Sequence, residues 1–208
     1  MRGVRTRCGG KGCGMTSTRH ELILNALWPA SEQGKFEVWG ILDCARDPRI
    51  YPALRQSRLQ YRCLYSGTLP RALEAVAPHI VELFPQSKLL GQWLEEGWGE
   101  AWGVFVKIAD WSNLRYHLRK FLKVQDEDGR KLLFRYYDPR VLRVYLHTCT
   151  TQERNQVFGP IESFLMEDLD GREIVEFRRN VELPKLIALE QPTRGSELAA
   201  TPEISTMR

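Results

Sequence analysis

The chain has 208 residues, of which 43% are hydrophobic and 27% are charged, as is typical of a globular protein with a sizeable core. Five of its 30 basic residues and none of its 26 acidic residues lie in residues 1–20, so the formal net charge of +4 comes from this segment. The almost neutral remainder argues against a nucleic-acid groove as the main function. No apolar run approaches the ~20 residues of a membrane-spanning helix, and no apolar segment follows the basic N-terminus as a secretory signal requires. We therefore expect a cytosolic protein.

Composition and periodicity divide the chain into four predicted segments. Residues 1–18 are rich in Gly, Arg and Thr and are expected to form a disordered basic extension, in which Met15 is a candidate translation start. Strand and helix patterns predict an α/β domain over residues 19–150, followed by a helix and hairpin extension over residues 151–185. The Pro, Ser, Thr and Gly content of residues 186–208 predicts a flexible tail.

Hydrophobic patterns predict helices and strands that alternate along the chain. The expected helices cover residues 20–28, 87–97, 110–124, 140–146 and 152–158. The expected strands cover residues 35–43, 59–67, 78–84, 101–108 and 131–137, and a hairpin over residues 159–179 turns at "DLDG". This alternation predicts an α/β fold, a layered mixed β-sheet with flanking helices, followed by a small helical and hairpin C-terminal extension.

The chain contains five cysteines, an odd number that argues against a disulfide framework in the absence of a secretion signal. Cys8 and Cys13 lie in "CGGKGC", a spacing that does not match the usual zinc pairs, and no second pair complements them. Cys44 and Cys63 lie at the ends or in the interiors of apparent strands, where small buried thiols are common. We therefore expect neither a metal site nor a cofactor.

The order strand, Asp-Pro-Arg, helix occurs twice, in "LDCARDPRIYPAL" and in "FRYYDPRVLRVYL". Asp47 and Asp138 can each accept hydrogen bonds from the free N–H groups that begin a helix. Pro48 and Pro139 suit the first helical position, and Pro52 suggests that the first helix begins only after a further turn. Capping therefore explains both junctions without any catalytic role.

A catalytic interpretation of the same residues stays open. Three aspartates are expected just beyond strand ends, where open α/β sheets bind ligands: Asp43, Asp47 and Asp138. Four nearby arginines could bind a phosphate or carboxylate: Arg46, Arg49, Arg135 and Arg140. The four histidines fall in separate predicted elements, so no candidate base completes the set. The alternative to a non-enzymatic protein is a phosphate-handling enzyme that uses Asp138, Arg135 and Arg140.

The glycine-rich segment "EEGWGEAWGVF" follows a helix and opens a strand, the reverse of a phosphate-binding loop. It predicts a tight turn with Trp98 and Trp102 packed over it, although a tryptophan exposed as an anchor for a partner is a second interpretation. Two basic groups have helical spacing and could contact an acidic partner, or could simply be solvated: Arg115, Arg119, Lys120 and Lys123 in the first, and Arg140, Arg143 and His147 in the second.

Five segments, in order, carry a family resemblance: "VWGILDCARDPRIYPAL", "YRCLYSG" with "LPRALEAVAPHIVEL", "LLGQWLEEGWGEAWGVFV", "LRYHLRKFLKVQDEDGRKLLFRYYDPRVLRVYL" and "FGPIESFLMED". Over residues 21–168 the chain resembles the adaptor-chaperone family of bacterial type VI secretion. The resemblance implies no enzymatic activity, no cofactor and no small-molecule substrate. It implies binding of a toxic effector protein and help in loading it onto the valine–glycine-repeat spike protein.

The positions that match the family's motif residues are Asp43, Asp47, Arg49, Tyr65, Trp98, Trp102, Arg135, Tyr136, Asp138, Arg140 and Arg143. The resemblance leaves open whether they contact a partner or build the fold. The basic N-terminal extension departs from the family pattern, and nucleic-acid binding through it is a third hypothesis.

Overall fold

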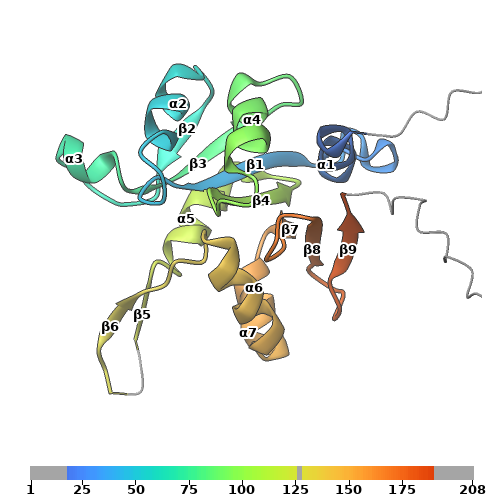
Figure 1. The fold of residues 1–208 in the computed structure, drawn as a ribbon. Helices are drawn as coiled ribbons and strands as arrows, with labels where there is room; N and C mark the ends of the chain where they lie inside the picture. Colours follow the sequence, from blue (N-terminus) through green and yellow to red (C-terminus); the bar gives the residue numbers. More distant parts are fainter. Residues whose placement is uncertain (1–17, 126–127, 190–208) are drawn as a thin grey trace, which may run out of the picture.

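The computed structural model describes residues 18–125 and 128–189, and its centre is a seven-stranded β-sheet (Figure 1). The strands of this sheet are β1 Glu37–Asp43, β2 Tyr61–Cys63, β3 Pro78–Leu83, β4 Gly103–Ile108, β7 Ile161–Glu167, β8 Glu173–Arg178 and β9 Lys185–Ala188. Their order is β2-β3-β1-β4-β7-β8-β9, and every pairing is antiparallel. A separate antiparallel hairpin consists of β5 Lys123–Gln125 and β6 Lys131–Leu133.

Within the described residues seven α-helices flank the sheet: α1 Arg19–Leu27, α2 Ile50–Gln56, α3 Arg71–Glu74, α4 Lys88–Gln92, α5 Leu114–Arg119, α6 Pro139–Thr148 and α7 Thr151–Phe158. Short 3-10 turns occur at Ala30–Glu32 and Trp111–Asn113, and a π-helical turn, Trp93–Gly97, continues α4. The sequence sets several helix starts locally. α1 and α7 each begin with a capping box, Thr18 with Glu21 and Thr150 with Glu153.

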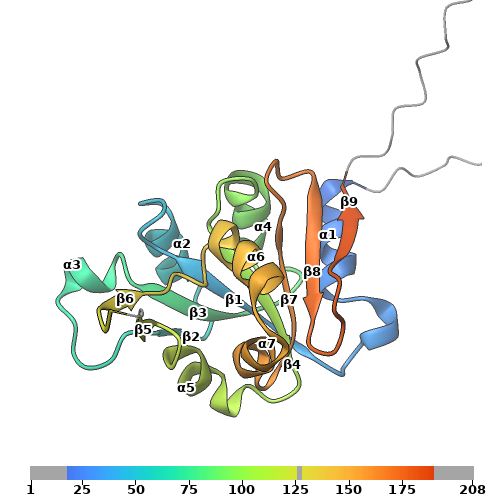
Figure 2. The same cartoon turned by 90° about the horizontal axis from the view of Figure 1, so that it is seen from below.

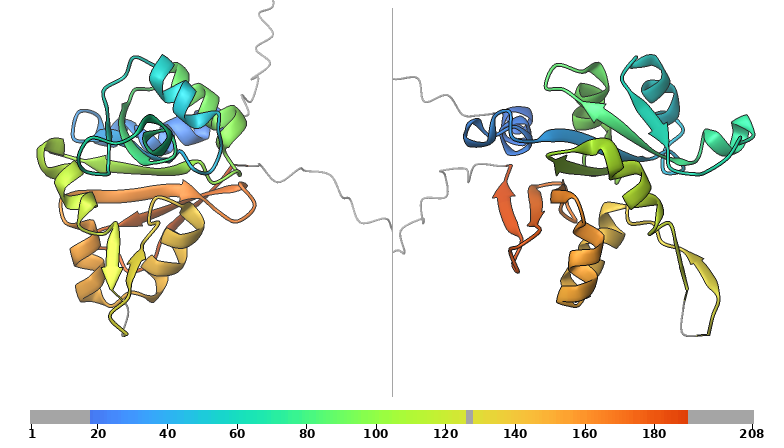
Figure 3. Two further views of the ribbon diagram at one scale, coloured as in Figure 1. Left: turned by 90° about the vertical axis from the view of Figure 1, so that its left-hand side faces the viewer. Right: turned by 180° about the vertical axis from the view of Figure 1, so that it is seen from behind.

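Period-two alternation along the central strands separates two hydrophobic cores, one on each face of the sheet. On β1, Trp39 and Ile41 face one core, while Val38 and Leu42 face the other. Helices α5, α6 and α7 cover the first core, and α1, α2 and α4 cover the second, so the molecule has three layers (Figures 1 and 3). β4 is buried along its whole length because it lies in the middle of both cores.

The α/β class and the flanking helices predicted from the sequence are confirmed. The structure adds that the hairpin β7–β8 continues the central sheet, because β7 pairs with β4. The mixed strand directions expected from the alternation are not found: every pairing in the sheet is antiparallel, because short helices and turns return the chain without parallel crossovers. β9 and β5 were not predicted, and the strand expected over residues 131–137 ends at Leu133.

The start of α2 differs from one expectation. Pro48 is not at the first helical position, because Pro48 and Arg49 form a turn and α2 begins at Ile50. Pro52 consequently falls in the first turn of α2, where its missing N–H would have no partner within the helix. The later helix start suggested by Pro52 is thus confirmed. The predictions for Met15, Cys8 and Cys13 lie outside the described residues.

Candidate functional site

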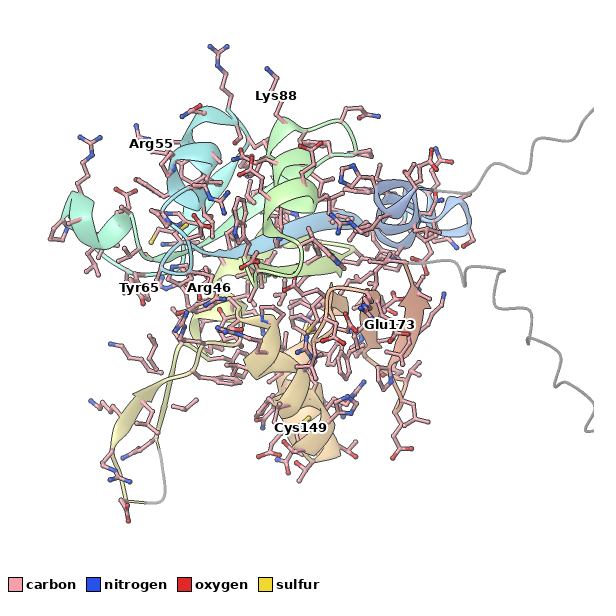
Figure 4. All side chains as sticks on the ribbon, viewed as in Figure 1. Arg46, Arg55, Tyr65, Lys88, Cys149 and Glu173 are labelled. Carbon is pink, nitrogen blue, oxygen red and sulfur yellow. The ribbon has the colours of Figure 1, made fainter. Side chains whose placement is uncertain are left out.

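Most of the residues that match the family motif lie at one end of the central sheet. β1 ends there with Asp43, β4 begins there just after Trp102, and β7 ends there with Glu167. The antiparallel register brings these three strand ends together, since Leu42 pairs with Gly103 and Phe105 pairs with Leu165. Figure 4 shows Tyr65 and Arg46 at the same end of the molecule. The site is therefore built by the sheet rather than by a single loop.

Asp43 and Arg135 form an ion pair between the end of β1 and the segment before α6. The Asp43 side chain is 1% exposed, whereas that of Arg135 is 41% exposed. The bond to Asp43 raises the pKa of Arg135 above its usual value, despite partial burial that opposes the charge. The main-chain N–H of Asp43 donates to the carbonyl of Trp102 at 2.8 Å, which ties this pair to the start of β4.

Both Asp-Pro-Arg segments adopt the same local arrangement, in which the aspartate binds the arginine two residues later. Asp138 accepts from the Arg140 main-chain N–H at 3.0 Å and from the guanidinium Nε and Nη2 at 2.9 and 2.6 Å. Asp47 accepts from the Arg49 main-chain N–H at 2.8 Å and from Nε and Nη2 at 3.1 and 2.7 Å. Fork-shaped pairing of this kind is strong because two parallel bonds carry opposite charges.

Only one of the two aspartates caps a helix. Asp138 is the N-cap of α6 and Pro139 occupies its first position, as the sequence predicted. Asp47 binds the Arg49 N–H in the turn before α2, whose N-cap residue is Arg49 itself. Burial opposes ionisation of Asp138, yet the bonds from the Arg140 side chain and main chain hold its pKa below the usual range. The Arg49 side chain lowers the pKa of Asp47 in the same way.

Arg49 joins α2 to the π-helical turn. Its Nη1 donates to Glu96 at 2.8 Å, and its guanidinium lies 5.4 Å from the ring centroid of Trp102. Trp102 is fully buried, and its ring lies against Gly97, where an added Cβ would come within 2.3 Å of Cδ2. A side chain at Gly97 is therefore excluded by the tryptophan, which explains the glycine at this position.

The loop after the π-helical turn is held by β7 and by the β7–β8 turn. Glu167 accepts hydrogen bonds from the main-chain N–H groups of Gly99 and Ala101 at 2.6 and 2.8 Å. Trp98 donates from its indole nitrogen to the carbonyl of Gly171 at 2.8 Å. Burial raises the pKa of Glu167, although these two N–H donors oppose the shift. Trp98 and Trp102 are both buried, in agreement with the packing interpretation of the glycine-rich segment.

The remaining motif residues stabilise the surroundings of the site. Arg143 is largely buried and donates to the main-chain carbonyl of Glu167 at 2.5 Å, and burial lowers its pKa. Tyr136 is buried and donates to the carbonyl of Leu118 at 2.9 Å. Tyr65 is half-buried and packs against the core that α5, α6 and α7 cover. Arg143 therefore braces the fold, a point that the sequence had left open.

Two buried charged residues, Glu167 and Lys107, were not predicted from the sequence. Glu167 is recognisable as an acidic residue at the end of an apolar strand, but the sequence does not indicate which groups it bonds. Lys107 is 1% exposed within β4 and forms ion pairs with Glu32 at 3.0 Å and Glu176 at 3.7 Å. Arg178 completes this group by pairing with Glu32 at 2.7 Å. The group lies near the N-terminal end of β1, away from the motif residues, because Lys107 pairs in register with Val38.

The chemistry available at the motif residues follows from their pairing. Each aspartate is bound by an arginine, while Arg49, Arg135 and Arg140 keep 51%, 41% and 49% of their side chains exposed. Half-exposed guanidinium groups can bind carboxylates or carbonyl groups of another molecule. Across residues 18–125 and 128–189, no group of three or more His, Cys, Asp or Glu side chains could hold a metal ion.

A family model described as "Domain of unknown function (DUF4123)" matches residues 38–156, which is more than half of the chain. The chain belongs to this family. All the motif residues lie inside the DUF4123 match, whereas Glu167 lies beyond its end. The curated proteins and the solved structures gave no match. Among the described helices, none combines the length and the apolar character that crossing a bilayer requires.

Proposed function

We propose that this chain is an adaptor that binds a type VI secretion effector in the bacterial cytoplasm and promotes its loading onto the valine–glycine-repeat spike protein. The observation that supports the proposal most is the position of the motif residues. Within a DUF4123 chain that resembles secretion adaptors, they gather at one sheet end and leave three arginines half-exposed. Arginine is enriched among residues that dominate protein–protein binding energy.

The pairing within the site favours binding over proton transfer. A general base needs a free lone pair and a pKa near the working pH. Asp138 instead accepts three bonds from Arg140, and its pKa is lowered, so it stays ionised and occupied at neutral pH. The buried aspartates hold the arginines in fixed orientations, which lowers the entropy that these long side chains lose when a partner binds.

A phosphate-handling enzyme that uses Asp138, Arg135 and Arg140 is the alternative. One observation favours it, namely that two residues with half-exposed guanidinium groups bond to Asp138: Arg140 through its side chain, and Arg135 through its main-chain carbonyl. Against it, both guanidinium groups already bind carboxylates, so an incoming phosphate would have to compete with Asp43 and Asp138. We therefore rank the adaptor function first.

Co-purification tests the adaptor function. The chain is co-expressed, with an affinity tag, alongside the proteins encoded next to its gene, and the bound proteins are identified by mass spectrometry. We expect a stable complex with one neighbour and a higher soluble yield of that neighbour. Failure to retain either an effector or a spike protein contradicts the proposal. The double variant Arg135→Gln/Arg140→Gln should weaken the complex more than Lys88→Gln, a control at the start of α4, which lies on the other face of the sheet from α6 (Figures 1 and 4).

A further inference from the structure

A groove of about 580 Å³ lies next to the projecting hairpin β5–β6, and its residues only partly overlap the motif residues. We call it the hairpin groove. Its walls come from the segment after β2, from α5 and from the base of the hairpin, and its lining residues are Leu64, Tyr65, Ser66, Leu69, Tyr116, Arg119, Lys120, Leu122, Lys123 and Leu133. Figures 1 and 2 show the hairpin extending from the body on the same side of the molecule as α3.

One wall of the groove is fixed by the half-buried side chain of Arg115. Arg115 on α5 donates from Nε to the carbonyl of Cys63 at 2.8 Å and from Nη2 to the carbonyl of Tyr65 at 3.2 Å. These bonds hold the segment after β2 against α5. The groove is therefore present before any partner binds, which reduces the cost of association.

Apolar side chains are unusually exposed around the groove. Tyr116 is 66% exposed and Leu133 is 49% exposed. On the other face of the hairpin, Val124 pairs with Leu132, and both are also exposed. A two-stranded hairpin alone is only marginally stable in water, and packing against another element is what normally stabilises it. The exposed apolar residues thus mark a surface on which a partner can complete the packing.

The charges at the groove are unpaired, in contrast to those at the motif residues. Arg119, Lys120 and Lys123 form no ion pair with a carboxylate in the part of the chain that the structure describes. The ammonium group of Lys120 lies 4.6 Å from the ring centroid of Tyr116, which keeps it at the groove. Lys131 shares a hairpin face with Lys123 and Leu133, because side chains alternate along β6. The groove therefore joins apolar surface to unneutralised positive charge.

We propose that the hairpin groove is the docking site for a segment of a protein partner in which apolar side chains are flanked by Asp and Glu. The apolar side chains pack on Tyr116 and Leu133, and the carboxylates pair with Arg119, Lys120 and Lys123. Charge complementarity selects this occupant over residues 190–208 of the same chain, which contain three acidic and two basic residues and are almost neutral. Charge complementarity also favours the acidic segment over a second copy of this chain, because the positive charges of two hairpin grooves would repel each other.

Peptide binding tests the groove without reference to the adaptor function. The probe is a fluorescein-labelled 15-residue peptide with Leu at helical spacing and Glu elsewhere, and the control peptide has Lys in place of Glu. We expect the Glu peptide to bind saturably and the Lys peptide not to bind. Lys120→Glu/Lys123→Glu should weaken binding at least about tenfold, as expected for charge pairs at a partly desolvated interface. Tyr116→Ser/Leu133→Ser should weaken binding by a similar factor, because it removes the apolar contact.

Matched variants elsewhere separate the groove from a general charge effect. Arg55→Glu/Lys88→Glu reverses two charges on the face away from the hairpin (Figure 4), and Leu169→Ser removes an apolar side chain that is 82% exposed. Both should leave the affinity within about twofold of wild type, with thermal stability measured for every variant. Equal weakening by groove and control variants, or no binding of the Glu peptide, overturns the proposal. So does sedimentation showing that wild type forms a dimer that Tyr116→Ser/Leu133→Ser abolishes, because the occupant would then be a second copy of this chain.

Co-purification with the same groove variants tests whether the groove binds the partner of the proposed function, and this experiment rests on that function. If wild type retains an effector or spike protein and Lys120→Glu/Lys123→Glu does not, the groove holds that partner. If both retain it equally, the groove is not its docking site and the adaptor function stands. If wild type retains nothing, the adaptor function fails and the peptide experiment alone decides the groove.

Discussion

Arg135 pairs with Asp43, which stands 92 residues earlier in the chain and is almost completely buried at the end of β1. The ion pair holds the segment before α6 against the end of β1. A buried carboxylate that loses its cation is costly, because burial removes the water that would otherwise solvate it. The pair therefore has a role in stability whether or not Arg135 also contacts a partner.

Arg135→Gln should lower the free energy of unfolding by about 1–3 kcal/mol, less than the ~3–5 kcal/mol of fully buried pairs because Arg135 is 41% exposed. Urea unfolding followed by tryptophan fluorescence measures the change. Asp43→Asn in the Arg135→Gln background should cost less than in wild type, because the buried charge has then lost its partner already. Additive losses in this double-mutant cycle would mean that the two side chains do not interact.

Asp138→Ala removes the N-cap of α6 and should destabilise the protein by about 1–2 kcal/mol. Asp47→Ala is the matched control, because Asp47 makes the same bonds to its arginine without capping a helix, and it should cost less. Asp138→Asn should fall between wild type and Asp138→Ala, since its oxygen can still accept the Arg140 N–H. A catalytic role predicts a different result for Asp138→Asn: loss of turnover with an unchanged melting temperature.

Acid should destabilise the protein through Asp47 and Asp138, whose pKa values are both lowered in the folded state. A carboxyl group whose pKa is lowered by folding stabilises the protein at pH values above its pKa in the unfolded chain, which is about 3.9 for Asp. This stabilisation is lost as the pH falls through the lower pKa of the folded state. The unfolding free energy of wild type should therefore decrease below about pH 4, and the Asp138→Asn variant should show a shallower decrease.

Glu167 should act in the opposite direction. Burial raises the pKa of Glu167 in the folded protein above its pKa in the unfolded chain. The free energy of unfolding should therefore decrease as the pH rises from the lower of these two pKa values to the higher one. Urea unfolding at a series of pH values, in wild type and Asp138→Asn, measures the sum of these effects. Parallel curves for the two proteins would show that Asp138 is not preferentially ionised in the folded state.

Gly97→Ala should destabilise the protein by about 1–3 kcal/mol, the usual cost of forcing extra atoms into a packed core. The new Cβ would lie 2.3 Å from Cδ2 of Trp102, which is fully buried. Gly91→Ala is the control, because an added Cβ at this position of α4 has no heavy atom within 4 Å. Gly91→Ala should be neutral or slightly stabilising, so a loss of stability at both positions would point to backbone effects instead.

Short sequence patterns were enough to predict the helix start at Asp138 and the buried strand β1, because each depends on neighbouring residues in the chain. The capping role of Asp138 follows from the order Asp-Pro-Arg, and the buried strand β1 follows from its continuous apolar run. The strand β9 was missed because most of its side chains are exposed and show no periodicity. Of the hairpin β5–β6 only β6 was predicted, because residues 123–124 of β5 continue the helical spacing of residues 110–124 whereas α5 ends at Arg119.

Long-range pairing could not be predicted in the same way. The sequence placed Asp43, Arg135 and Asp138 near strand ends, but which arginine reaches which aspartate depends on the order of strands in the sheet. Arg143 shows the same limit, because its helical spacing suggested a solvated stripe while the structure buries it against Glu167. The unpaired state of Lys120 likewise depends on which acids the fold brings near.

The pairing of β7 with β4 makes the DUF4123 segment dependent on residues outside it. A fragment of residues 38–156 would leave residues 105–108 of β4 without hydrogen-bonding partners on the edge that β7 covers, and would expose Phe105 and Val106 on either face of the strand. Such an edge is a template for aggregation. The part of the chain that the family model recognises therefore lacks the strand that covers this edge of β4, and an excised version should extend through β8 to keep the edge paired.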